Sequence, residues 1–295
     1  MDPWIETYRG TVFRWEVDGN DHLTVAYYFS RFADAGLGLL EALGLGTDTI
    51  RRERRACVTV ECYVRYLREL RGGDIMHVTS GVIEVGADGL VLGHKLLNSE
   101  TGALCTTVEQ RVTHVELDGR TLAPLDDAAR RAAEARRVVW DGPARERRPA
   151  PRGFEGFRDT ARDTVKPWEI DVFGQSALTF FIHRFSAANS QALAAFGMTP
   201  GYMREERRGF STFEFQLALA GRLSPGDPVF VRSGLLHVGA SSLRLFHSMV
   251  NGRSGEVCAT LDQLGVHFDQ DARRPTPLPD ALREKAKAIL APTEP

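Results

Sequence analysis

The chain has 295 residues, enough for two domains of ordinary size that each bury their own hydrophobic core. Lysine and arginine number 37 against 39 aspartates and glutamates, and the formal charge of −2 gives no reason to expect nucleic acid or an anionic membrane as partner. No segment is apolar over the length of a membrane span, and the N-terminus lacks the pattern of a signal peptide. We therefore expect a cytoplasmic protein.

The two halves of the sequence repeat each other without a gap. An offset of 153 residues carries Trp15 onto Trp168, and about a third of the aligned positions are identical. Further identical pairs are Glu16 and Glu169, Arg31 and Arg184, Glu61 and Glu214, His94 and His247, and Gln110 and Gln263. Each half is therefore predicted to be a complete unit of one design. Two such copies typically form a pseudo-symmetric dimer, with any functional site at their interface.

The predicted elements follow the same order in both copies. In the first copy, a strand over residues 11–17 leads through a polar loop into a helix over residues 23–43, whose apolar residues recur at helical spacing. After an arginine-rich turn, apolar and polar residues alternate over residues 58–66 and indicate a strand. Three more strands ending near residues 85, 97 and 116 complete an antiparallel meander. This order predicts an α+β fold in which a sheet wraps one long helix.

The second copy repeats this pattern, with its long helix predicted over residues 176–196. A further helix closes each copy, over residues 126–137 in the first and 280–290 in the second. Between the copies the sequence is rich in arginine, proline and glycine, as in a surface linker. We therefore predict a first domain over residues 1–140, a linker over 141–156 and a second domain over 157–295.

The predicted order of elements carries a family resemblance. A strand, the loop motif D-x-N-x-H (Asp18, Asn20, His22), a helix with Tyr28, and then Glu61 on the next strand resemble the hotdog-fold thioesterases of the 4-hydroxybenzoyl-CoA thioesterase type. The end of each copy, around His94 and His247, is similar to thioesterase domains associated with carnitine and betainyl-CoA breakdown. The resemblance covers nearly the whole of both copies. It implies a tandem double hotdog, a pseudo-dimer joined through its sheets, that hydrolyses an acyl-CoA at the seam between units.

The loop motif contains the first candidate catalytic residues. Thioester hydrolysis needs a carboxylate that activates water or attacks the carbonyl, and N–H groups at a helix N-terminus can stabilise the oxyanion. Asp18 is the candidate base or nucleophile, with Asn20 beside it and His22 positioning the thioester or the water. The alternative interpretations are that Asp18 caps the helix or shapes a turn, and that His22 is an ordinary loop histidine.

The second copy keeps the carboxylate as Asp171 but has Phe173 and Gln175 where the first has asparagine and histidine. Glutamine can hydrogen-bond a thioester oxygen but cannot titrate near neutral pH. The two seams are therefore predicted to be inequivalent, with the first loop carrying most of the activity. Glu61 and Glu214, at equivalent strand positions, are either solvated strand carboxylates or competitors of Asp18 for the general-base role.

Arginines between the helix and the next strand recur in both copies, and they are either a solvated edge or a clamp for the phosphates of coenzyme A. The candidates for such a clamp are Arg54, Arg55, Arg207 and Arg208. Tyr28 and Phe181 are candidates for an apolar substrate wall, although both also fit an ordinary core. His94 and His247 alternate with leucines, which favours buried, hydrogen-bonded histidines.

No histidine or cysteine spacing indicates a metal site, and no glycine-rich phosphate motif is present, so we expect neither metal nor cofactor. Three functions follow from the sequence. The first is a cofactor-independent acyl-CoA thioesterase, and the second is a hotdog hydratase or dehydratase. The third is a non-catalytic module that binds or senses acyl-CoA. The internal pseudo-dimer leaves room for further homo-oligomer formation.

Overall fold

A computed structural model describes residues 2–119 and 121–294 of the chain. The chain divides into two compact units. The first runs to Ala144 and also contains Ile170–Thr179, and the second contains Arg145–Glu169 and continues from Phe180 onward. The repeat and the units therefore differ at residues 170–179, because this loop of the second copy lies with the first unit.

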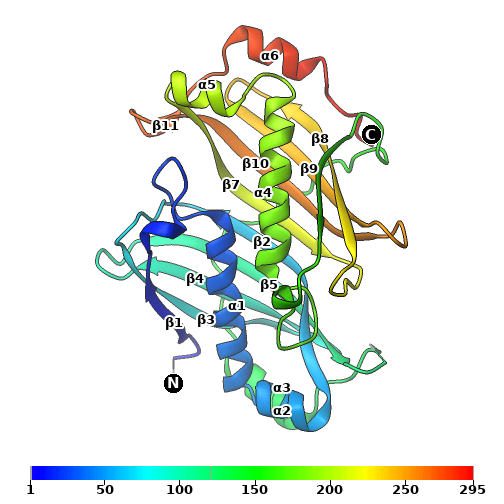
Figure 1. Ribbon diagram of the computed structural model, residues 1–295. Coiled ribbons are helices and arrows are strands. Elements are labelled where there is room, and N and C mark those ends of the chain that lie inside the picture. The colour runs from blue at the N-terminus through cyan, green and yellow to red at the C-terminus, as the bar shows by residue number, and fades with distance from the viewer. Residues whose placement is uncertain (1, 120, 295) are drawn as a thin grey trace. The chain divides into compact units, whose positions relative to one another are not determined.

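The first unit is an antiparallel sheet in the order β1-β3-β4-β5-β2. Its strands are β1 (Ile5–Thr11), β2 (Arg55–Tyr66), β3 (Ile75–Val85), β4 (Gly89–Asn98) and β5 (Leu104–Glu116). The long helix α1 (Val25–Ala42) packs along one face of this sheet, and the short helices α2 (Thr47–Glu53) and α3 (Asp127–Ala135) lie at one end of α1 (Figure 1).

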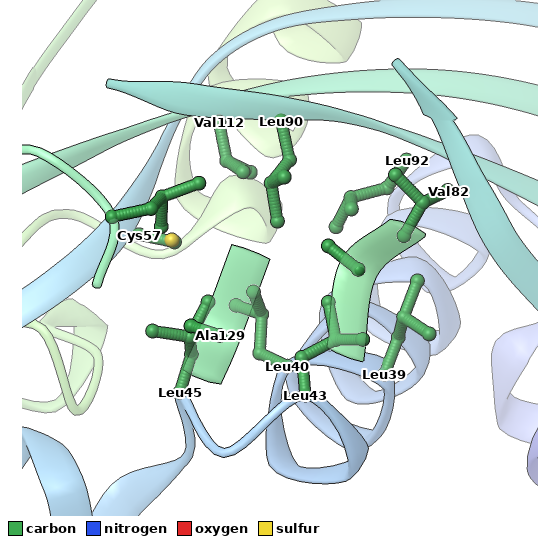
Figure 2. Close-up of a cluster of buried hydrophobic side chains, with 12 residues drawn as sticks. Leu39, Leu40, Leu43, Leu45, Cys57, Val82, Leu90, Leu92, Val112 and Ala129 are labelled. Carbon is green, nitrogen blue, oxygen red and sulfur yellow. The ribbon is translucent and has the colours of Figure 1, made fainter. Parts of the chain in front are cut away.

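The helix and the sheet of the first unit enclose an apolar core. Leu39 and Leu40 of α1 and Leu43, the residue that follows it, point toward Leu90 and Leu92 of β4, and Figure 2 shows these side chains with others from β3, β5 and α3. All five leucines are buried. The i, i+3, i+4 spacing in the sequence therefore places this face of the helix against the sheet, and its burial is the main stabilising contribution to the unit.

The second unit has the corresponding order β7-β10-β9-β8-β6. Its strands are β6 (Arg158–Thr164), β7 (Arg208–Leu219), β8 (Pro228–Val238), β9 (Ser242–Asn251) and β10 (Val257–Asp269), with the short β11 (Arg274–Pro275) paired to β10. Its helices are α4 (Leu178–Ala194), α5 (Pro200–Glu205) and α6 (Asp280–Lys287). Each copy thus has one long helix and an antiparallel sheet, and the predicted α+β hotdog fold is confirmed.

The structure corrects three predicted elements. The strand predicted over residues 11–17 lies earlier, at β1, because the Glu16 carboxylate accepts a hydrogen bond from Phe13 N and folds Arg14–Glu16 into a 3₁₀ turn. In the second copy Pro167–Glu169 forms the same turn. The arginine-rich turn contains the helix α2, which follows Gly46, and the corresponding turn of the second copy contains α5.

The third correction concerns β2, where strict alternation predicts that Thr59 and Glu61 share a face. A bulge between these residues breaks the alternation, so that Thr59 pairs with Val112 and Glu61 pairs with Arg111. Val112 belongs to the core under α1, and Thr59 therefore lies on the helix side while Glu61 lies on the opposite face. The same irregularity separates Thr212 from Glu214 in β7.

Candidate functional site

The Asp18 loop is a closed turn that leads into α1. Asp18 N donates to His22 O at 2.8 Å, and Asp21 N donates to Asp18 O at 3.1 Å. Asp18 Oδ1 accepts hydrogen bonds from Asn20 N at 2.8 Å and from His22 N at 3.0 Å. Asp18 therefore shapes the turn, as the structural interpretation of this residue predicts.

The other carboxylate oxygen of Asp18, Oδ2, does not take part in the backbone hydrogen bonds that close the turn. Asp18 Oδ2 has Asn20 Nδ2 at 3.3 Å, and the residue as a whole is exposed. One oxygen therefore holds the loop while the second remains accessible to water. The turn role and a role as base are compatible, because they use different oxygens of one carboxylate.

A buried ion pair fixes the position of this loop on the helix. Arg31 of α1 donates through Nη2 to both oxygens of Glu16, at 2.6 and 2.7 Å, and both side chains are buried. Arg184 and Glu169 form the same pair in the second copy. The identity of these residues in both copies was visible in the sequence, but their role as an anchor was not predicted.

His22 has an acidic neighbour that the sequence analysis did not identify. His22 Nε2 lies 2.6 Å from Glu69 Oε2, and Glu69 Oε1 lies 3.3 Å from Arg71 Nε. Only 14% of the His22 side chain is exposed. Glu69 therefore orients the imidazole.

The start of α1 offers two hydrogen-bond donors close to the loop. Thr24 is the N-cap residue, and its side chain caps no backbone group. Tyr27 N and Tyr28 N donate to Thr24 O, whereas Val25 N and Ala26 N have no partner within the part of the chain that the structure describes. These two N–H groups can stabilise developing negative charge on a carbonyl oxygen.

The second loop has the same backbone but different side chains. Asp171 Oδ1 accepts from Phe173 N at 2.9 Å and from Gln175 N at 3.0 Å. Phe173, at the position of Asn20, packs against a buried cluster of the first unit that includes Ile50 and Val58. The second loop therefore keeps the turn and uses the Asn20 position for apolar packing.

The structure distinguishes the two strand glutamates. Glu214 of β7 is completely buried, and its oxygens accept from Arg148 Nη1 at 2.5 Å and Nη2 at 3.2 Å. The side chain of Glu61 is 27% exposed, and Arg111 Nε lies 3.7 Å from its Oε2. The role of Arg148 was not predicted, because this residue lies outside the repeated part of the chain.

A chain of buried hydrogen bonds crosses the sheet under α1 and reaches the bulge beside Glu61. Thr7 Oγ1 lies 2.6 Å from Ser80 Oγ, which lies 2.7 Å from His94 Nδ1. His94 Nε2 lies 3.0 Å from Gln110 Oε1, and Gln110 Nε2 donates to Thr59 Oγ1 at 2.6 Å. We call this chain the buried relay. Thr160, Ser233, His247, Gln263 and Thr212 form the corresponding relay in the second copy.

Hydrogen-bond chemistry sets the direction of the relay. Because an amide oxygen only accepts, His94 Nε2 carries the proton and Nδ1 accepts from Ser80. Burial lowers the pKa of His94 to about 4 and that of His247 to about 4, so both imidazoles are neutral near pH 7. The predicted buried histidines are confirmed. Identical residues at the repeat offset could also have identified Thr7 and Ser80.

Each predicted arginine clamp residue lies beside a carboxylate at the end of a strand or turn. The ion pairs are Arg54 with Asp118, Arg55 with Glu116, Arg207 with Asp271 and Arg208 with Asp269, all at 2.8 or 2.9 Å. This arrangement favours their interpretation as a solvated edge. Tyr28 and Phe181 are both buried, and Tyr28 makes an edge contact with the Tyr66 ring at a centroid distance of 5.1 Å.

Over the residues that the structure describes, no group of three acidic, histidine or cysteine side chains is arranged to hold a metal ion. In the same part of the chain, none of the helices combines the length and the apolar character that crossing a bilayer requires.

The sequence matches the thioesterase-like superfamily twice, over residues 12–133 and 165–286. The two matches cover most of the chain and correspond to its two copies, so the chain belongs to this superfamily. The predicted family and the predicted enzyme class, a thioester hydrolase, are confirmed by this finding.

Two relatives with a named activity match part of the sequence. A betainyl-CoA thioesterase from Pseudomonas aeruginosa is 28% identical over 135 residues, which are 46% of this chain and 85% of that protein. An L-carnitine dehydrogenase/betainyl-CoA thioesterase from Agrobacterium fabrum is 30% identical over 127 residues, which are 43% of this chain but only 26% of that protein. Each match has about the length of one copy.

Solved structures show the same fold over most of the chain. A putative oleoyl thioesterase from Lactobacillus plantarum superposes with a TM-score of 0.71 and 12% identity, covering 93% of this chain and 97% of that one. The 12:0-ACP thioesterase from Umbellularia californica has a TM-score of 0.69 and 13% identity, covering 90% and 94%. At these identities the likeness establishes the fold alone.

Proposed function

We propose that this protein is an acyl-CoA thioesterase in which the Asp18 loop and the start of α1 form the chemical centre. The observation that carries the proposal is the geometry of Asp18. One carboxylate oxygen closes the loop and the other is accessible, in a chain that belongs to the thioesterase-like superfamily. The relatives named betainyl-CoA thioesterases make a coenzyme A thioester the first substrate class to test.

In the proposed reaction, Asp18 Oδ2 accepts a proton from water as the water oxygen attacks the thioester carbonyl. The Val25 and Ala26 N–H groups stabilise the oxyanion, and His22, held by Glu69, orients the thioester or the water. The C–S bond then breaks, and the coenzyme A thiolate takes the proton from Asp18. The alternative is direct attack by Asp18, which forms a mixed anhydride that water hydrolyses.

Incubation with a panel of acyl-CoAs of short and medium chain length, betainyl-CoA included, tests the proposed activity. We expect release of free thiol without added metal or nucleotide. The absence of thiol release across the panel would favour a binding module, and a change in enoyl-CoA absorbance would favour a hydratase. A single turnover in ¹⁸O-labelled water separates the two chemical routes, because only direct attack places an unlabelled Asp18 oxygen in the first product.

A further inference from the structure

Two aromatic side chains of the first unit lie on its surface directly before the Asp18 loop. The rings of Phe13 and Trp15 stack in parallel, with centroids 4.5 Å apart and an interplanar angle of 5°. Tryptophan is on average largely buried in folded proteins, but Trp15 is 71% exposed. With Phe13 against one face of the indole, the other face is accessible to a ligand. We call this pair the Phe13–Trp15 stack.

Buried polar contacts fix the backbone that carries the stack. The buried Glu16 carboxylate accepts hydrogen bonds from Phe13 N at 3.0 Å and from Arg31 Nη2 at 2.6 and 2.7 Å. Phe13 and Trp15 are thereby held at one short 3₁₀ turn. The stack is therefore formed before a ligand arrives, and binding does not have to order the two aromatic residues.

Arg14, which lies between the two aromatic residues in the sequence, connects the stack to the Asp18 loop. Its Nη1 lies 2.6 Å from Asp21 Oδ1. A Cβ at Gly72 would lie 3.1 Å from Arg14 Cδ, so the arginine side chain runs along the backbone between β2 and β3. The stack and the Asp18 loop thus belong to one unit and are joined by contacts within it. Because Arg14 is already paired, this surface offers a ligand mainly an aromatic face.

The second copy keeps the tryptophan but lacks the stack. At the repeat offset Lys166 takes the place of Phe13. Trp168, the counterpart of Trp15, is 80% exposed and has no aromatic ring against it in the part of the chain that the structure describes. The stack therefore occurs in the copy whose loop also has the complete D-x-N-x-H motif.

We propose that the Phe13–Trp15 stack binds the adenine ring of coenzyme A on the open face of Trp15. This inference rests on the proposed function, and it assigns a part of the substrate that lies outside the reacting thioester. Adenine is the one aromatic ring of coenzyme A, and nucleic-acid bases bind exposed aromatic side chains by stacking. The flexible pantetheine arm joins the adenine end to the thioester end, so one substrate molecule can contact both the stack and the Asp18 loop of the same unit.

Binding of 3′,5′-ADP, measured by calorimetry without any acyl group, tests the stack independently of hydrolysis. We expect Trp15→Ala to weaken binding about tenfold, the scale for loss of one base–aromatic stack, and Trp15→Phe to keep most of the affinity. The matched control is Trp168→Ala, which removes the exposed tryptophan of the other copy and should change the affinity less than twofold. Ribose 3,5-bisphosphate, which lacks the base, should bind the parent protein and Trp15→Ala alike.

For hydrolysis, Trp15→Ala should raise KM for an acyl-CoA about tenfold and leave KM for the corresponding acyl-pantetheine, which lacks the nucleotide, unchanged. Melting temperatures close to that of the parent are expected, because the substituted side chain is exposed.

Three results would overturn the inference: no binding of 3′,5′-ADP to the parent protein, an affinity that Trp15→Ala leaves within twofold, or an equal rise in KM for both substrates. If ADP binding depends on Trp15 but no acyl-CoA is hydrolysed, the stack stands as a nucleotide site and the proposed function fails. Hydrolysis of acyl-CoA with an ADP affinity independent of Trp15 would reject the stack and leave the proposed function in place.

Discussion

At the position before His22, the two copies place different residues in the same left-handed backbone conformation. Asp21 has φ = 59° and its counterpart Gly174 has φ = 69°, so both lie in the left-handed region. Aspartate tolerates this conformation better than most residues, and Asp21 also pairs with Arg14 at 2.6 Å. Glycine needs no such compensation. The exchange between aspartate and glycine at this position therefore changes the side chain and leaves the course of the loop intact.

Gly174→Ala should destabilise the protein by about 1 kcal/mol, because a Cβ is strained at positive φ even where space is open. The matched control is Gly19→Ala, since a Cβ at Gly19 also meets nothing within 4 Å and no positive φ applies there. The second copy already carries Val172 at that position. Urea unfolding of both variants measures the difference, and equal losses would contradict the backbone argument.

Glu214→Gln should lower the free energy of unfolding by about 2 kcal/mol or more, because it leaves the largely buried Arg148 without its main partner. Glu61→Gln should cost less than Glu214→Gln, because the Glu61 side chain is 27% exposed and that of Glu214 is 1% exposed. Thermal or urea unfolding checks the contrast. A larger loss in Glu61→Gln than in Glu214→Gln would contradict the argument that the buried Glu214–Arg148 pair contributes more to stability than Glu61 does.

At the scale of elements, periodicity predicted the long helices and most of the meander, because burial of one face imposes the pattern directly. It missed the 3₁₀ turn at Glu16, the helix α2 and the bulge in β2. These features depend on side-chain hydrogen bonds and on glycine positions, which residue propensities and hydrophobic periodicity do not take into account. The Gln110–Thr59 bond, at the end of the buried relay, holds Thr59 on the helix side of the bulge. The two residues lie on neighbouring strands but are far apart in the sequence, so local sequence patterns do not reveal this contact.

The relay predicts a pH dependence of stability. The pKa values of His94 and His247 fall from 6.5 to about 4 on burial, so the unfolded chain binds two more protons than the folded chain between these values. Their contribution is complete above about pH 6.5 and is lost as the pH falls toward 4. The expected slope is about 1.4 kcal/mol per pH unit for each histidine.

Urea unfolding between pH 4 and 6.5 measures this slope in His94→Gln and His247→Gln. Each single variant should be less stable near pH 7 and should lose stability less steeply on acidification. Carboxylates contribute alike to the parent and the variants, so the difference in slope isolates the histidine. In the double variant the two changes should add, because the relays lie in separate copies. A slope equal to that of the parent protein would refute the assignment.

For the whole molecule, the two copies agree in scaffold and differ in the candidate site. The Glu16–Arg31 anchor, the relay and the Asp18 turn each have a counterpart at the same offset. The repeat therefore allowed the fold and the candidate loops to be predicted from sequence. It could not predict the role of Arg148, which has no counterpart, nor that residues 170–179 would lie with the first unit.

This divergence predicts that the two copies contribute unequally to turnover. Asn at position 18 can still accept both backbone N–H groups through its amide oxygen but carries no charge, so Asp18→Asn should keep the loop and lose the base. We expect kcat to fall by about a hundredfold or more, the usual scale for loss of general acid–base help. Asp171→Asn should cost clearly less, because its loop has Phe173 packed in the Ile50 cluster where the first loop has Asn20.

The comparison requires both variants to be folded, and their melting temperatures should lie close to that of the parent, since each substitution preserves the turn contacts. Steady-state kinetics on the best substrate of the panel then gives the two defects side by side. A defect of Asp171→Asn equal to or larger than that of Asp18→Asn would reverse the assignment of the active loop. If neither substitution slowed turnover, the carboxylates of Glu61 and Glu214 would become the candidates, and Glu61→Gln would be the next variant to measure because its side chain, unlike that of Glu214, is partly exposed.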